Sequence, residues 1–199
     1  YKSPTDMGVN MVGHCIFDDE AVCDASKMEI VRRYYDTLCR RRNGTADAEE
    51  IYKLELIMNK VGVDKEYRKV AAAALKKAEA TGEPAAAIEL PDGSIVTGKT
   101  SKLMGPSAAA LLNALKKLGG LNEELLLLPP VVIEPIQKLK IENLGNHNPR
   151  LHADEILIAL AISATNNPIA ALALEQLPRL KGCEAHNTVM VSEVDKTTY

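Results

Sequence analysis

The first third of the chain has the hydrophobic spacing of amphipathic helices. Over residues 19–42, apolar side chains recur at intervals of three and four, which places them on one buried face. The same spacing over residues 47–60 and 64–80 predicts two further helices. Because short connections favour antiparallel neighbours, we predict a helical bundle of about three helices. The predicted helical domain covers residues 1–82 and starts with an irregular lead-in, residues 1–17.

The hydrophobic pattern changes after residue 82. Two short apolar runs, residues 86–90 and 94–97, flank Pro91-Asp92-Gly93, whose residue types favour a tight turn and therefore a β-hairpin. The elements predicted after the hairpin are helices over residues 107–118, 151–165 and 168–177 and strands over residues 131–141 and 187–192. This order of elements predicts a sheet with helices packed on it. The expected fold class is α+β or α/β, with a second domain over residues 83–199.

Composition narrows the classes of partner. The chain has 199 residues, of which 46% are hydrophobic and 26% are charged, so we expect a sizeable core. It has no Trp and one Phe, which argues against a base-stacking platform for nucleic acids. Its net charge of −3 argues against a broad phosphate-binding surface. We therefore expect no nucleic-acid partner.

Other features of the sequence predict a cytoplasmic protein. No apolar run is long enough to span a bilayer, so we expect no membrane partner. The 4 cysteines form no small disulfide framework, and we interpret them as reduced thiols. Because the chain begins with Tyr rather than Met, we expect it to be part of a longer polypeptide. An upstream domain of the same polypeptide is then the first expected partner.

Residues Gly93 to Thr100 match the phosphate-loop pattern G-x-x-x-x-G-K-(S/T) letter for letter. A working loop of this kind follows a strand and enters a helix directly, whereas the middle residues here favour the second strand of the hairpin. We therefore interpret the match as a coincidence. A weaker hypothesis is an anion site, because the segment leads to a predicted helix start and helix N-termini bind anions. The candidate phosphate-binding residues are Gly98, Lys99, Thr100, Ser101 and Ser107.

Two distant clusters carry the side-chain types that bind zinc. His152, Asp154 and Glu155 stand at a predicted helix start, and Cys183 and His186 are three residues apart. Zinc deaminases carry H-x-E followed by P-C-x-x-C, and this chain has H-x-D-E followed by G-C-x-x-H. We hypothesise that His152, Cys183 and His186 bind zinc. Glu155 or Asp154 would then transfer protons as the catalytic group.

The same residues also have a structural interpretation. Asp154 and Glu155 favour a helix N-terminus through the helix dipole, and Cys183 would be a small buried residue. His152 would make a local hydrogen bond. The deaminase pattern is broken at three places, since Asp154 holds the position of the acid, the proline is missing and His186 replaces the last cysteine. The metal hypothesis requires the two clusters to meet in the folded chain.

Three segments resemble one uncharacterised bacterial family. Residues 1–11, the predicted helix of residues 151–164 and the string Lys181-Gly182-Cys183-Glu184-Ala185-His186 are similar to the C-terminal part of the family called domain of unknown function 1846. The resemblance implies a helical domain followed by a three-layer α/β subdomain of cytidine-deaminase-like layout. It also implies longer family members with an N-terminal α/β region, and it supplies no catalytic residue.

Two functions stay open from the sequence. The first is part of an enzyme that acts on a nucleotide or a phosphorylated small molecule, with the ligand near residues 98–107. The second is a non-catalytic regulatory or assembly module in a homo-oligomer. Its interface would use the apolar helices, the alanine-rich residues 70–75 and the exposed edge of the hairpin. Ligand binding and oligomeric state distinguish these two functions.

Overall fold

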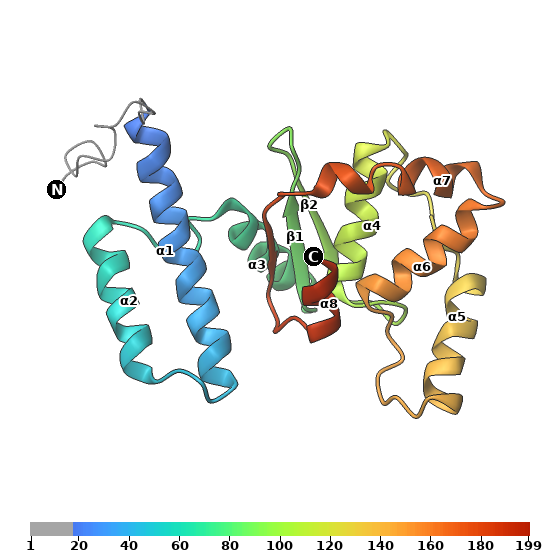
Figure 1. The fold of residues 1–199 in the computed structure, drawn as a ribbon, viewed down its shortest axis with the longest axis horizontal. Coiled ribbons are helices and arrows are strands. Elements are labelled where there is room, and N and C mark those ends of the chain that lie inside the picture. The colour runs from blue at the N-terminus through green and yellow to red at the C-terminus, as the bar shows by residue number, and fades with distance from the viewer. Residues whose placement is uncertain (1–17) are drawn as a thin grey trace. The chain divides into compact units, whose positions relative to one another are not determined.

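The computed structural model describes residues 18–199 (Figure 1). It divides into two compact units, residues 1–68 and residues 69–199. The predicted irregular lead-in of residues 1–17 lies outside the described residues. Among the helices between residues 18 and 199, none combines the length and the apolar character needed to cross a membrane.

A helical hairpin forms the described part of the first unit. α1 (Asp19–Arg42) begins after Asp18, whose carboxylate accepts a hydrogen bond from the backbone N–H of Ala21. α2 (Ala48–Val61) begins after Asp47, whose carboxylate caps its first turn in the same way. These caps satisfy backbone N–H groups that have no partner inside the helix. Both helices therefore lie close to the residues that the sequence predicted.

The first unit has a small core and two helices where three were predicted. Val31, Met58 and Val63 are buried between α1 and α2, with tyrosine rings around them. The third predicted helix does not begin at Asp64, because this residue caps a short turn through Glu66 N. The helix begins at residue 69 instead and belongs to the second unit. The compact helical unit thus ends at residue 68, whereas we predicted a helical domain up to residue 82.

A three-stranded antiparallel sheet lies at the centre of the second unit. β1 (Ala85–Glu89) pairs with β2 (Ile95–Lys99) through the predicted hairpin and with β3 (Ala185–Asn187) on its other side. The strand order is β2-β1-β3. Pro91 and Asp92 occupy the turn, and Gly93 has a φ of +79°, which strains any residue with a side chain.

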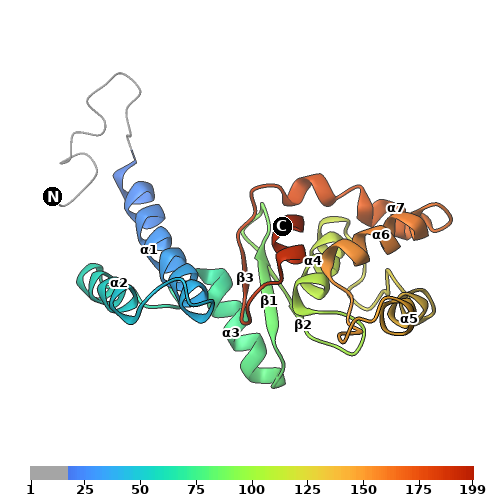
Figure 2. The same ribbon diagram turned by 60° about the horizontal axis from the view of Figure 1, so that its bottom comes forward.

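Helices cover both faces of this sheet (Figures 1 and 2). α3 (Lys69–Thr81) packs Val70 and Ala74 against Ala87, while α4 (Pro106–Leu118) packs on the face that carries Ala86 and Ile88. Successive strand residues point to opposite faces, so β1 is buried on both sides. The fold is therefore a mixed α+β fold in which two helices enclose a small sheet.

Small residues let α4 approach the sheet closely. A Cβ atom on Gly98 of β2 would lie 2.1 Å from the backbone nitrogen of Ala110, so only glycine fits there. Ala71 and Ala74 of α3 are fully buried, which uses the alanine-rich surface inside the unit. We predicted this surface as an oligomer interface; Val70, Ala71 and Ala74 are used inside the unit, while Ala72, Ala73 and Leu75 are half-buried.

The remaining helices pack beside α4 and form the largest apolar core. They are α5 (Pro130–Lys138), the π-helix η2 (Leu139–Asn143), α6 (Ala153–Ala164), α7 (Pro168–Leu174), the 3-10 helix η3 (Leu177–Leu180) and α8 (Glu193–Thr198). Leu115, Ile133, Leu151, Ile156 and Leu160 are its largest fully buried side chains. Asn167 caps α7, and Pro168 occupies its first turn as predicted.

Two predicted strands are wrong. Residues 131–141 form α5 and the start of η2, because Val132, Ile133 and Ile136 face the core with helical spacing. β-branched residues suggested a strand there, but packing determined the helix. Of residues 187–192 only Asn187 belongs to a strand, since β3 ends there and the chain continues into α8.

Candidate functional site

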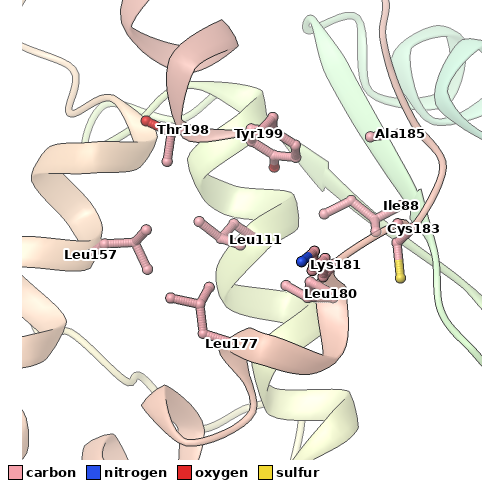
Figure 3. Close-up of a pocket in the computed structure, with 11 residues that line it drawn as sticks. Ile88, Leu111, Leu157, Leu177, Leu180, Lys181, Cys183, Ala185, Thr198 and Tyr199 are labelled. Carbon is pink, nitrogen blue, oxygen red and sulfur yellow. The ribbon is translucent and has the colours of Figure 1, made fainter.

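A partly open cavity of about 430 Å³ lies within the second unit (Figure 3). Leu111 of α4 and Leu157 of α6 form two of its walls, and Leu177 and Leu180 come from η3. Ile88 of β1 faces it from the sheet, and α8 and the residue after it complete the lining. The full set of lining residues is Ile88, Leu111, Leu157, Leu177, Leu180, Lys181, Gly182, Cys183, Ala185, Thr198 and Tyr199.

The turn after η3 places polar groups beside this apolar lining. η3 ends at Leu180, and Gly182 has a φ of +82°, a conformation strained for any residue with a side chain. This turn directs the chain into β3 and leaves Lys181 and Cys183 on the two sides of Gly182. The ammonium of Lys181 has no ion-pair partner among residues 18–199, and the residue is exposed.

The other titratable groups of the cavity keep their protons at neutral pH. Burial, and then the nearby charge of Glu89, raises the pKa of the Cys183 thiol. A raised pKa disfavours the thiolate, which is the form that attacks substrates and binds zinc. The Cys183 thiol is therefore not activated as a nucleophile in this environment.

Tyr199 is anchored through its hydroxyl group. Its hydroxyl donates a hydrogen bond to the backbone oxygen of Ser107 at 2.8 Å. Although 49% of the residue is exposed, the hydroxyl end is enclosed, and burial together with the charge of Asp195 raises the pKa of the phenol. Thr198 donates its hydroxyl to the Val194 oxygen. Lys181 is thus the polar side chain of the cavity whose charged group has no partner among the described residues.

A second polar cluster surrounds the start of α6. Lys140 is 4% exposed, and its ammonium donates to Glu155 Oε2 at 2.7 Å and to the Arg150 oxygen at 2.9 Å. The same Glu155 oxygen accepts from the backbone N–H of His152 at 2.8 Å. Glu155 therefore combines an N-terminal cap with a buried ion pair, which fixes the segment leading into α6.

Asp195 of α8 binds the same helix start from the other side. Its Oδ1 accepts from the backbone N–H of Ala153 at 2.8 Å, and its Oδ2 lies 3.3 Å from His152 Nδ1. Ser192 Oγ also lies 3.3 Å from His152 Nδ1. In a catalytic triad the serine and the carboxylate contact different ring nitrogens, whereas both contact Nδ1 here. The arrangement joins α8 to α6 and is not that of a triad.

The predicted zinc ligands do not form a metal site in the described chain. Among residues 18–199, no group of three or more His, Cys, Asp and Glu residues could hold a metal ion. His152 contacts Asp195, Cys183 lines the cavity, and His186 is buried in β3 opposite Ala87. The two clusters that the hypothesis needed together thus serve separate parts of the second unit.

The two predicted proton-transfer groups have different environments. Glu155 is occupied by Lys140 and by the His152 backbone. Asp154 Oδ1 is buried and has no hydrogen-bond partner. The structural interpretation of a helix-start carboxylate describes Glu155 well, because its oxygen does cap the helix.

Most of the predicted phosphate-binding residues make contacts within the chain instead. Gly98 lies under α4, and the Thr100 hydroxyl donates to the Pro84 oxygen at 3.1 Å. The Ser101 hydroxyl accepts from two backbone N–H groups of its own turn. The Ser107 hydroxyl lies 3.3 Å from Asn187 Oδ1. Lys99 is exposed at the end of β2, so the phosphate-loop letters span a hairpin, as interpreted from the sequence.

A second pocket, of about 360 Å³, is also lined by lysines. Two of them, Lys116 and Lys117, have structural roles at the end of α4. Lys116 donates its ammonium to the backbone oxygens of Glu123 and Leu125, and burial lowers its pKa. Lys116 and Lys117 lie in the last turn of α4, where cations stabilise the negative end of the helix dipole. This pocket is therefore a weaker candidate than the cavity beside Lys181.

Sequence reasoning missed several residues of these clusters. Tyr199 and Asp195 stand in no motif, Lys181 appeared only in the string that carries the family resemblance, and Lys140 was placed in a predicted strand. Their only sequence signal is proximity to Gly182 or to a helix cap, which many surface residues share. Their roles come from contacts between segments that are distant in the chain, such as Asp195 with Ala153.

Comparisons with known proteins identify the family. Residues 1–62 match the N-terminal part, and residues 66–199 the C-terminal part, of the domain of unknown function DUF1846. A UPF0371 protein of Streptococcus pneumoniae serotype 19F (strain G54) is 56% identical over 196 residues, which cover 98% of this chain and 40% of the relative. UPF0371 proteins of strains CGSP14 and JJA have the same identity and coverage. The chain thus spans about 40% of the length of these relatives, and it belongs to the DUF1846 family of bacterial UPF0371 proteins.

Proposed function

We propose that the second unit binds a nucleotide or another phosphorylated small molecule in the cavity of Figure 3, as part of an enzyme. The observation that carries this proposal is a partly open cavity, lined mainly by apolar side chains, with the unpaired ammonium of Lys181 in its lining. Small-molecule sites are typically concave and mostly apolar, with a few polar groups that fix the ligand.

The lining suggests how such a ligand would be oriented. Leu111, Leu157 and Leu177 offer contact to a flat or apolar body such as a base. Lys181 would neutralise the phosphate at the exposed side of the cavity. A volume of about 430 Å³ falls within the usual range of ligand pockets. The ligand would therefore be a small molecule rather than a polymer.

The proposed role of this cavity is binding rather than bond breaking. Cys183 and Tyr199 keep their protons, so neither acts as a nucleophile or base at neutral pH. In this proposal the reactive groups come from the part of the relatives that this chain does not span. Zinc and the deaminase-like layout stay predictions of the sequence, and ligand binding in this cavity requires neither.

Ligand-dependent thermal stability of the full-length protein tests the proposal. Nucleoside phosphates, sugar phosphates and inorganic phosphate form the panel, and a ligand at 100 times its Kd stabilises a protein by about 2.7 kcal/mol. Leu177→Trp, which fills the cavity, should abolish the shift. The matched control is Ile162→Trp, because Ile162 is 66% exposed on α6 and lies outside the cavity. A panel without any stabilising ligand, or equal shifts in both variants, contradicts the proposal.

A second candidate function is the assembly module. Ile158 and Ile162 of α6 and Ile169 and Leu172 of α7 are 40–66% exposed. Contact with a second copy of the chain would bury these side chains. The hairpin edge is a weaker interface, because Asn113 already donates to the outer Thr97 oxygen. Light scattering of the full-length protein with Ile158→Ser and Ile162→Ser distinguishes a dimer from a monomer.

A further inference from the structure

α8 forms one wall of the proposed ligand cavity. Thr198 and Tyr199 line it opposite the leucines of η3, and Figure 3 shows both side chains above Leu111. Leu111 is only 5% exposed. Access to the cavity floor therefore depends on where α8 lies.

The attachments of α8 are mostly polar. Asp195 is bound to the Ala153 N–H and lies beside His152, and Ser192 contacts the same imidazole. Tyr199 adds the bond from its hydroxyl to Ser107 at the start of α4. These contacts join α8 to the starts of two helices that also line the cavity.

Apolar packing contributes little to holding α8. Val194 is 44% exposed, and in the described chain no residue from 188 to 199 belongs to an apolar core cluster. α8 has 6 residues, and helices of this length are unstable without tertiary contacts. Segments with few buried apolar contacts open locally at low free-energy cost.

The chain offers a pivot before α8. Thr188 is fixed to β1, because its N–H donates to the Ala85 oxygen at 2.9 Å and its hydroxyl accepts from the Ala85 N–H at 2.9 Å. Residues 189–191 then follow without helix or strand. Rotation in this segment would move α8 while β3 stays paired.

We infer that α8 is a lid over the cavity and that Asp195 is its latch. The lid closes when Asp195 caps α6 and Tyr199 bonds to Ser107, and it opens when both bonds exchange to water. Opening leaves the apolar core of α4, α6 and η3 intact. The inference rests on the proposed function only in that the lid would control entry of that ligand.

Thiol labelling of a buried cavity position tests the lid without any ligand. Leu111→Cys is introduced into full-length protein whose native cysteines are replaced by serine, and its reaction with dithionitrobenzoate is timed. When opening is fast and rare, the labelling rate is proportional to the open population. Adding Asp195→Ala should increase this rate about fivefold, as expected for a lost cap of about 1 kcal/mol, while Glu193→Ala on the exposed side of α8 should leave it unchanged.

A second variant separates a lid from a folding defect. Tyr199→Phe keeps the ring and removes only the bond to Ser107, so it should accelerate labelling severalfold while the protein stays folded and its melting temperature falls only slightly. Equal labelling rates for Asp195→Ala and Glu193→Ala overturn the inference. So does a Tyr199→Phe rate equal to that of the parent protein. The labelling experiment contains no ligand, so it tests the lid independently of the proposed function. A ligand panel without a stabilising ligand would not change the labelling result, and a negative labelling result would not change the outcome of the panel.

Discussion

α4 and α8 line the same cavity, but different interactions hold them in place. α4 buries Ala108, Leu112 and Leu115 in the apolar core and packs on the sheet along its length. α8 is fixed by Asp195 and Tyr199 through hydrogen bonds and contributes no side chain to that core. Apolar burial scales with area and is lost only when the core opens, whereas a few hydrogen bonds exchange readily with water. The cavity therefore has one rigid wall and one movable wall.

The largest expected effect comes from the rigid wall. Leu115 is fully buried, so Leu115→Ala should lower the free energy of unfolding by about 2–5 kcal/mol through lost burial and a cavity. Leu126 is 70% exposed, and Leu126→Ala serves as the control with a change below about 0.5 kcal/mol. Urea denaturation measures both. Similar losses of stability for the two variants would contradict the claim that α4 is held by the apolar core.

The ion pair behind α6 should have the next largest effect. Lys140→Met leaves Glu155 without its cationic partner in a site where the lysine side chain is 5% exposed and the glutamate 25%. Removing one partner of a buried pair is costly, and partial exposure reduces this to about 2 kcal/mol. Lys140→Met with Glu155→Gln should recover part of the loss in urea denaturation. A double variant as unstable as the sum of both single variants would show that the pair is not coupled.

The latch should affect global stability less. Asp195→Ala removes the bond to the Ala153 N–H, and losing such a cap costs about 1 kcal/mol. Since α8 opens without the core, the midpoint of urea unfolding should move less than in Leu115→Ala. A loss of several kcal/mol would show that α8 unfolds together with α4, and the two walls would then be equivalent.

The smallest effect is expected at high pH. Burial raises the pKa of the Tyr199 phenol, so the folded chain keeps a proton that the unfolded chain releases above about pH 10. The stabilising effect of this hydroxyl is complete below that pH and decreases as the pH rises toward the folded-state pKa. Tyr199→Phe should therefore reduce the loss of stability between about pH 10 and pH 11 by a few tenths of a kcal/mol. If the stability of Tyr199→Phe had the same pH dependence as that of the parent protein, the Tyr199 hydroxyl would be exposed to water rather than buried.

The two walls also differ in how well the sequence predicts them. Periodic apolar residues and Gly119-Gly120 predict α4, because its burial follows a helical repeat. Nothing comparable marks α8, whose position depends on Asp195 meeting a helix start 42 residues earlier in the chain. α5 shows the opposite error, since its β-branched residues suggested a strand and its packing produced a helix.

The candidate site was predicted only in part. Cys183 was identified, but as a zinc ligand, and its raised pKa arises from burial that the sequence does not reveal. His152 was expected to bind metal or to make a local bond, and it lies beside Asp195. Lys181 carries no pattern of its own, because an unpaired ammonium beside a cavity is a property of the folded chain.

The most direct test of ligand binding is calorimetric titration of full-length protein with the best phosphorylated ligand of the panel. Lys181→Met should raise its Kd at least tenfold, since a charge-assisted hydrogen bond contributes about 1.5–3 kcal/mol. Lys99→Met, at the exposed lysine of the phosphate-loop pattern, should leave the Kd unchanged. A Kd that responds to Lys99 and not to Lys181 would contradict the account and place the phosphate at the hairpin instead.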